Sequence, residues 1–254
     1  IPAQWKGIQM TEKIALKEIK EKIIIALDVK SQSEAAKILE LLPEARIFKV
    51  GLELFTAEGP GMIELVRSYG HQVFLDIKLH DIPNTVAGAV RAAVRQGVSM
   101  LTLHTSGGKE MMSRAMDAAR EEAEKAGLRT PLLLGVTVLT SLKEKDLEEI
   151  GFRSEPQTQV LRLAGRALQS GLKGVVCSPH EIELLRREHG TDIKIITPGI
   201  RPVWAEAQDQ KRIMTPAEAL VKGADYMVIG RPIIQAANPE EAFARVVKEL
   251  EAAV

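Results

Sequence analysis

The sequence predicts an α/β protein that folds as a single closed (β/α)8 barrel, the TIM-barrel architecture. Three observations predict this fold class. Short apolar runs rich in β-branched residues recur eight times along the chain, helix signals stand between them, and the length of 254 residues matches the usual size of such a barrel. We therefore expect one domain over residues 1–254, with residues 1–20 as an N-terminal lead.

The expected strands are almost continuously hydrophobic. This pattern is typical of parallel strands that are covered on both faces. An open, doubly wound sheet is the alternative, but it would need a glycine-rich phosphate loop after the first run, and the segment ALDVKSQSEAAK contains no such loop. The eight runs span residues 23–29, 46–51, 72–78, 100–105, 132–139, 174–178, 193–199 and 226–231.

Helix boundary signals separate these runs. Ser31 with Glu34 forms a capping-box pattern before an apolar stretch. Thr215-Pro216 and Asn238-Pro239 each pair a capping residue with a proline at the first helical position. Glycines stand where helices should end, namely Gly70, Gly97, Gly127 and Gly171.

Composition limits the possible functions. The chain is 45% hydrophobic and 27% charged, with a formal net charge of zero, which argues against a broad surface for nucleic acid or anionic membrane. No apolar run approaches the roughly 20 residues of a membrane span. The single cysteine, Cys177, excludes a disulfide framework and a cysteine-based zinc site, so a cytoplasmic setting is the default expectation. Residues 1–9 could be a remnant of expression cloning, and they are left out of the fold prediction.

Charged residues collect where the predicted strands end. In barrels of this class the chemistry gathers at the C-terminal ends of the strands. The charges at or just after those ends are Asp28, Lys49, Asp76, Lys78, Arg201 and Arg231.

The segment FLDIKLHDIPNTV at residues 74–86 is the densest of these charged stretches. Residues two apart on a strand share a face, so Asp76 and Lys78 should point together into the barrel mouth. Asp81 lies in the following turn, before Asn84 or Thr85 caps the next helix. A structural salt bridge is one interpretation. The other interpretation adds Lys49, so that two lysines and two aspartates, Asp81 included, converge on one cavity. Their charges can alternate in sign, which keeps both ammonium groups charged.

At this point the sequence resembles the orotidine 5′-monophosphate decarboxylase family, of the bacterial type, from about residue 23 to residue 231. The segment FLDIKLHDIPNTV matches the family's D-x-K-x-x-D signature, and ALD, FKVG, VTVLTS, PGIRP, DQKRIMTP and GRPI follow in the family's order. The resemblance implies decarboxylation of orotidine 5′-monophosphate to uridine 5′-monophosphate without a cofactor or a metal.

The resemblance also implies residue roles. Lys78 would protonate C6 of the pyrimidine, Asp76 would lie against the substrate carboxylate, and Lys49 would hold Asp76 and contact the ribose. It further implies a homodimer in which Asp81 and Thr85 reach the neighbouring subunit's site. The remaining expected substrate contacts are Asp28 to the ribose, Thr140 and Ser141 to the pyrimidine, and Arg201, Gln210, Gly230 and Arg231 to the phosphate.

Two other functions compete with this interpretation. A magnesium-dependent sugar-phosphate decarboxylase or aldolase of the same superfamily would also use a D-x-K-x-x-D strand, and it would need a metal-binding acid, for which Glu53 is the candidate. A non-catalytic phosphate-binding barrel would not need both lysines and both aspartates to be present.

Overall fold

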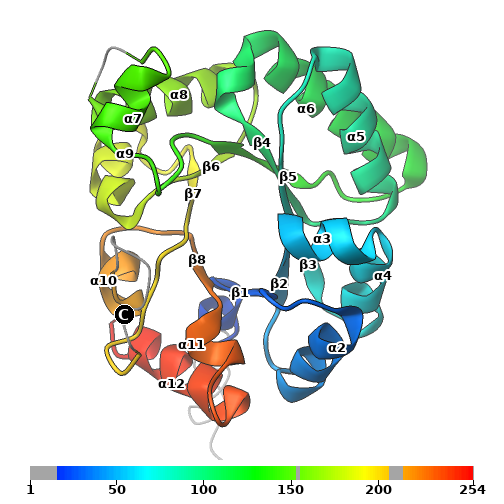
Figure 1. Ribbon diagram of the computed structural model, residues 1–254, viewed down its shortest axis with the longest axis vertical. Coiled ribbons are helices and arrows are strands. Elements are labelled where there is room, and N and C mark those ends of the chain that lie inside the picture. The colour runs from blue at the N-terminus through cyan, green and yellow to red at the C-terminus, as the bar shows by residue number, and fades with distance from the viewer. Residues whose placement is uncertain (1–15, 153–154, 206–213, 254) are drawn as a thin grey trace, which may run out of the picture.

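The computed structural model describes residues 16–152, 155–205 and 214–253. Its strands form a closed parallel barrel in which each strand pairs with the next in the chain and β8 closes onto β1, so the predicted fold class is confirmed (Figure 1). The strands are β1 (Ile23–Ala26), β2 (Ile47–Gly51), β3 (Gln72–Leu79), β4 (Met100–His104), β5 (Leu132–Val136), β6 (Gly174–Val176), β7 (Lys194–Thr197) and β8 (Tyr226–Ile229).

Helices surround this barrel on the outside, as Figure 1 shows. Among the described residues, three strand-to-strand connections carry one helix, two carry two helices, and two carry a 3-10 turn followed by a helix. The helices are α2 (Gln32–Leu41), α3 (Leu52–Glu58), α4 (Gly61–Ser68), α5 (Pro83–Arg95), α6 (Gly108–Ala126), α7 (Glu144–Glu149), α8 (Pro156–Gln169), α9 (Ile182–His189), α10 (Pro216–Val221), α11 (Arg231–Ile234) and α12 (Pro239–Glu251), with 3-10 turns η1 (Thr105–Gly107) and η2 (Pro179–Glu181).

The predicted helix caps are largely confirmed. The side chains of Thr215 and Asn238 accept hydrogen bonds from backbone amides in the first turns of α10 and α12. Ser31 caps α2 by accepting from the Glu34 amide, while the Glu34 carboxylate turns back to the amide of Lys30. The four glycines expected at helix ends all have positive φ angles, which glycine adopts at little cost.

One predicted helix start was wrong. Helix α5 begins at Pro83, with Ile82 in the capping position, so neither Asn84 nor Thr85 caps it. Proline is favoured in the first turn because its φ is already helical and its missing amide hydrogen would have no helical partner there. The sequence prediction placed the start too late because it gave the polar side chains more weight than Pro83.

Apolar side chains form two layers on either side of the strands. The larger layer lies between barrel and helices and includes Met111 and Met112, neither of which is exposed. The smaller layer fills the barrel interior and consists of Ile24, Ala26, Ile47, Phe74, Met100, Leu134, Ile196 and Val228. Because the interior is packed with side chains, space for a ligand is left only toward the strand ends.

Several strands end earlier than predicted. The run at 132–139 was expected to be one strand, but β5 ends at Val136. Val138, Leu139 and Thr140 then leave the sheet and line a cavity. Hydrophobicity alone does not distinguish the end of a strand from an apolar cavity wall, which explains the difference.

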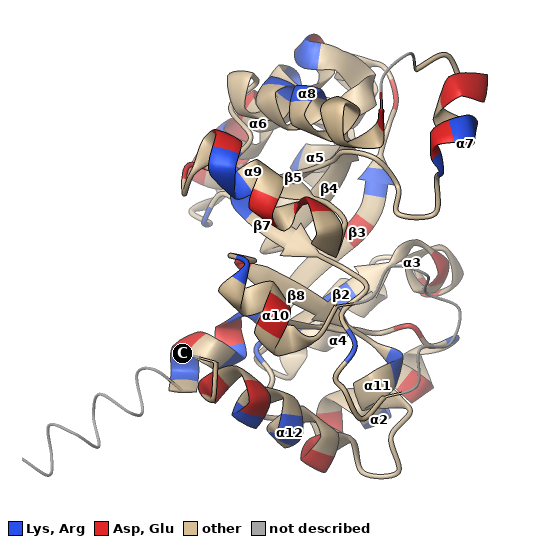
Figure 2. Cartoon of the chain, turned by 90° about the vertical axis from the view of Figure 1, so that its left-hand side faces the viewer, with Lys and Arg blue, Asp and Glu red and all other residues tan. Residues whose placement is uncertain are grey.

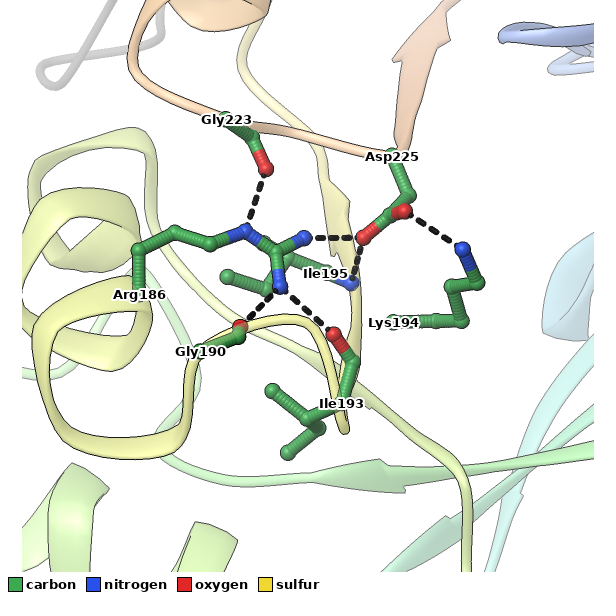
Figure 3. Close-up of polar contacts among 7 residues, drawn as sticks. All are labelled: Arg186, Gly190, Ile193, Lys194, Ile195, Gly223 and Asp225. Carbon is green, nitrogen blue, oxygen red and sulfur yellow. Dashed lines mark hydrogen bonds and ion pairs between the residues drawn. The ribbon is translucent and has the colours of Figure 1, made fainter.

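The base of the barrel, where the strands begin, is joined by an ion-pair network that we call the basal clamp (Figure 3). It consists of Arg186 on α9, Lys194 at the start of β7 and Asp225 just before β8. Both cations contact the Asp225 carboxylate, with Lys194 Nζ at 2.9 Å. The guanidinium of Arg186 also donates to the carbonyl oxygens of Gly190, Ile193 and Gly223 at 2.7, 2.7 and 2.8 Å. The clamp therefore connects three segments that are distant in sequence.

The outer surface carries charges of both signs, interspersed on helices such as α9 and α12 (Figure 2). Within the described ranges, no helix combines the length and apolar character needed to span a bilayer. The predicted cloning remnant at residues 1–9 lies outside the described residues.

Candidate active site

A cavity of about 270 Å³ opens at the C-terminal ends of the strands. Its floor is the upper part of the inner apolar layer, including Ala26, Phe74 and Val228. Eight of the predicted site residues line it, from strands on all sides of the barrel: Asp28, Lys49, Asp76, Lys78, Thr140, Arg201, Gly230 and Arg231. Closure of the barrel thus brings together residues that are up to about 200 positions apart in the sequence.

Four of these residues form a row of alternating charge, which we call the charge cage: Asp28, Lys49, Asp76 and Lys78. Lys49 Nζ lies 3.3 Å from Asp28 Oδ1 and 3.8 Å from Asp76 Oδ2. Lys78 Nζ lies 2.9 Å from Asp76 Oδ1. The side chains of Lys49 and Asp76 are only 12% and 15% exposed, so water screens their attraction weakly. Each cation lies beside a carboxylate, as in the predicted alternating array, but the second aspartate of the row is Asp28 and not the predicted Asp81.

The strand that supplies Asp76 and Lys78 is irregular at that point. Between β3 and β4 the pairing passes from Leu75 opposite Leu101 to Leu79 opposite Leu103. Lys78 has a φ of 50°, and it is the one non-glycine residue with a positive φ in the described part of the chain. The alternation of side chains on a regular strand predicted that Asp76 and Lys78 would point into the cavity together, and they do, but through a bulge that redirects the backbone.

At the other end of the cavity the residues suit an anionic group. Arg201 follows β7 and is 6% exposed, and Arg231 follows β8 at the start of α11. A side-chain carbon at Gly230 would lie 3.0 Å from Asp28 Oδ2 and 3.2 Å from the side chain of Ala26. Glycine at this position therefore allows β8 to approach β1 closely beside the two arginines.

Three predicted site residues that the structure describes are not among the residues lining this cavity. Asp81 is exposed, and its carboxylate accepts a hydrogen bond from the Ile82 amide at 2.6 Å. Thr85 is exposed on the first turn of α5, and Ser141 is exposed beyond Thr140. None of these three lines the cavity. Gln210 lies outside the described residues.

Sequence reasoning missed Thr102, a fully buried residue on β4. Its hydroxyl donates to Asp76 Oδ1 at 3.0 Å and accepts from the backbone amide of Lys78 at 2.9 Å. The signal was present, because a hydroxyl inside an otherwise apolar strand needs a hydrogen-bond partner.

Cys177 and His104 also lie close to the site. Cys177 is buried, as a small hydrophobe would be, and burial raises the pKa of its thiol well above the usual value, yet it also forms part of the cavity wall. His104 at the end of β4 packs on His80, with ring centres 5.3 Å apart. Burial, followed by the charges of His80 and Lys78, lowers the pKa of His104, which favours the neutral imidazole.

Comparison with known proteins places this arrangement in a family. The family model described as "Orotidine 5'-phosphate decarboxylase / HUMPS family" matches residues 21–246. The chain is 49% identical over 229 residues to the orotidine 5′-phosphate decarboxylase of Paramagnetospirillum magneticum, covering 90% of this chain and 97% of the relative. It is 50% identical over 234 residues to that of Moorella thermoacetica, covering 91% and 93%.

A solved structure agrees with these sequence relatives. The crystal structure of orotidine 5′-phosphate decarboxylase from Lactobacillus acidophilus superposes with a TM-score of 0.80 at 37% identity, covering 91% of this chain and 99% of that one. The alternating charges, the fold and the relatives lead to one conclusion: the chain belongs to the orotidine 5′-phosphate decarboxylase family.

Proposed function

We propose that this protein decarboxylates orotidine 5′-monophosphate to uridine 5′-monophosphate and carbon dioxide. The observation that carries the proposal is the charge cage on one side of a cavity whose other side holds two arginines. Orotidine 5′-monophosphate has matching parts, with a pyrimidine carboxylate at one end and a phosphate at the other. The family membership of the chain supports the same substrate.

The reaction needs stabilisation of a carbanion. Breaking the bond between C6 and the carboxylate leaves the electron pair on C6 and releases carbon dioxide. We propose that the Lys78 ammonium lies beside C6, stabilises the developing negative charge and then donates its proton there. Because the Lys78 ammonium can both stabilise the carbanion and protonate it, we propose that the enzyme needs no cofactor.

Asp76 would contribute by repelling the substrate carboxylate. Two like charges about 4 Å apart at an effective dielectric of about 20 repel by about 4 kcal/mol. If this whole repulsion energy were relieved in the transition state, the rate would rise by about a thousandfold. Enzymes exceed a thousandfold rate enhancement by far, so we assign the larger share of the transition-state stabilisation to Lys78. Lys49, which lies between Asp28 and Asp76, would keep Asp76 in place and contact the ribose.

The phosphate end would contribute binding energy away from the reacting carbon. Arginine forms paired, charge-assisted hydrogen bonds with phosphate oxygens, and Arg201 and Arg231 both line that end of the cavity. We propose that they hold the phosphate together with Gly230 and Gln210. Thr140 and Ser141 would contact the pyrimidine. This energy aligns the base against Lys78, so it raises turnover as well as affinity.

The magnesium-dependent alternative is less well supported by the geometry. Its candidate metal ligand, Glu53, is exposed on α3 and is absent from the residues that line the cavity.

The decisive experiment mixes purified protein with orotidine 5′-monophosphate in EDTA and follows the ultraviolet change of the pyrimidine. Turnover in EDTA supports the proposal. Turnover of a keto-sugar phosphate only when magnesium is added would overturn it, and binding without turnover of either substrate would favour the non-catalytic barrel.

We also propose a homodimer in the cytoplasm, with Asp81 and Thr85 reaching the partner subunit's cavity. Both residues are exposed and neither lines its own chain's cavity, and the adjacent Ile82 is 67% exposed, which suits an interface. The cytoplasmic setting rests on the single, buried cysteine and on the nucleotide substrate.

Shared sites can be tested by mixing two inactive variants. In a dimer of one Asp81→Ala chain and one Lys78→Ala chain, one site carries both changes and the other carries neither. Random exchange should therefore restore about one quarter of the wild-type sites. Verified mixed dimers without recovered activity would mean that each site is complete within one chain.

A further inference from the structure

We propose that Thr102 is a positioning residue that sets the geometry of both Asp76 and Lys78 through a single hydroxyl group. The inference rests on the proposed function, because it assigns Thr102 a role through the two residues proposed to act on the substrate. Thr102 is not exposed at all and does not line the cavity, so it does not contact the substrate itself.

The pairing of β3 with β4 places Thr102 opposite the bulge. Leu75 pairs with Leu101 and Leu79 pairs with Leu103, so residues 76–78 of β3 all lie opposite one residue of β4, Thr102. On the other side, Thr102 keeps its regular place opposite Leu134 of β5. The β4 strand is therefore fixed by β5, and it offers a rigid support for the irregular part of β3.

The Thr102 hydroxyl uses both of its hydrogen-bonding capacities on this bulge. As a donor it reaches Asp76 Oδ1 at 3.0 Å, and as an acceptor it takes the backbone amide of Lys78 at 2.9 Å. The same carboxylate oxygen accepts from Lys78 Nζ at 2.9 Å. One hydroxyl thus holds the carboxylate, and it also holds the backbone from which the ammonium projects.

The backbone of Lys78 needs such support. Its φ of 50° is in the left-handed region, which costs a residue with a side chain about 1–2 kcal/mol. The ladder that would normally hold the strand is interrupted here, and the Thr102 oxygen replaces a strand carbonyl as the acceptor. Without the hydroxyl, the amide loses its partner and the bulge can relax, which would move the Lys78 ammonium away from C6.

The test compares variants that differ in the hydroxyl. Thr102→Val keeps the shape and removes the hydroxyl, while Thr102→Ser keeps the hydroxyl and removes the methyl group. We expect Thr102→Val to lower kcat on the order of 100-fold, because a displacement of about 1 Å at a reacting group costs about that much. KM and the Kd for uridine 5′-monophosphate should change by less than about threefold, since the phosphate contacts lie elsewhere. Thr102→Ser should retain most of kcat.

A matched control separates positioning from packing. Thr105 is also buried, and its hydroxyl donates to the carbonyl of Val136 at 2.8 Å, away from Asp76 and Lys78. Thr105→Val should lower Tm without lowering kcat per folded molecule. If Thr102→Val only lowers Tm in the same way, Thr102 is structural and the inference fails.

The remaining outcomes are also decisive. If Thr102→Val does not fold, Thr102→Ala and Thr102→Ser form a second pair that differs by the hydroxyl alone, and equal kcat in that pair would overturn the inference. If neither hydroxyl-free variant folds, the hydroxyl is a folding determinant and the inference also fails. Wild-type protein that does not decarboxylate orotidine 5′-monophosphate would instead overturn the proposed function.

Discussion

The two ends of the barrel hold similar charged groups in different ways. At the base, Asp225 lies between Arg186 and Lys194 (Figure 3), and at the mouth, Asp76 lies between Lys78 and Lys49. Each arrangement is one carboxylate that contacts two cations. In the basal clamp, three backbone carbonyls and the carboxylate surround the Arg186 guanidinium.

The Lys78 ammonium of the charge cage has fewer protein partners than the Arg186 guanidinium of the basal clamp. Among the described residues, the Lys78 ammonium contacts Asp76 alone, although an ammonium can donate three hydrogen bonds. Lys78 also borders the cavity at the strand ends, whereas the Arg186 guanidinium donates to the chain's own carbonyls. The comparison teaches that the ion pair itself does not indicate function. What indicates it is hydrogen-bonding capacity that the protein leaves facing a cavity.

Lys78→Ala tests the charge cage, and its effect on turnover should be the largest of these substitutions. Loss of the cation and of the proton donor should lower kcat by about 10⁴-fold or more. The Kd for uridine 5′-monophosphate should stay within a few-fold, because the phosphate contacts remain. Single-turnover kinetics and calorimetric titration would measure the two quantities, and near-normal turnover would remove Lys78 from its proposed role.

Asp225→Asn tests the basal clamp, and it should lower stability while it leaves turnover nearly unchanged. Removing the carboxylate leaves the largely buried Arg186 guanidinium and the half-exposed Lys194 ammonium without a counter-charge, so the free energy of unfolding should fall by about 2–4 kcal/mol. Turnover at 25 °C should stay within about twofold, since the clamp lies at the far end of the barrel. Urea denaturation would measure the stability. Asp192→Asn, at an exposed position in the loop before β7, is the matched control and should change stability by less than about 0.5 kcal/mol.

Arg231→Ala and Arg186→Ala compare an arginine that lines the cavity with an arginine of the basal clamp. Charge-assisted hydrogen bonds to a phosphate contribute about 1.5–3 kcal/mol, so KM should rise about 10- to 100-fold and kcat should also fall. Arg186→Ala should leave KM unchanged and lower Tm instead. A steady-state profile of Arg231→Ala that matches the wild type would reject its role at the phosphate.

The smallest expected effect is the pH dependence of the clamp. Burial by itself would raise the pKa of Asp225, but hydrogen bonds from Lys194 and Ile195 and the charge of Arg186 together lower it below its usual 3.8. The unfolded chain therefore binds a proton more readily, and the stability from this group is present above about pH 4 and lost as the pH falls through the lower folded value. The stability difference between wild type and Asp225→Asn should narrow below about pH 4. A difference that stays constant down to pH 2 would contradict this account.

Sequence reasoning predicted the barrel and the charges at its mouth because both leave local patterns. Apolar runs identify buried strands, and a polar residue at the end of such a run is conspicuous. The clamp leaves no such pattern, because Arg186 and Asp225 are 39 positions apart and each resembles an ordinary surface charge. The bulge was also missed. Strand alternation in a single sequence does not show that β3 has gained residues relative to β4, so the role of Thr102 appears only once the two strands are paired.

The central claim is that the Lys78 ammonium lies beside the reacting carbon of a bound nucleotide. A crystal structure of the protein with uridine 5′-monophosphate tests this most directly. The account predicts Lys78 Nζ at about 3–3.5 Å from C6 of the pyrimidine, with the phosphate against Arg201 and Arg231. A pyrimidine ring bound far from Lys78, or a nucleotide held in the reverse orientation, would contradict it.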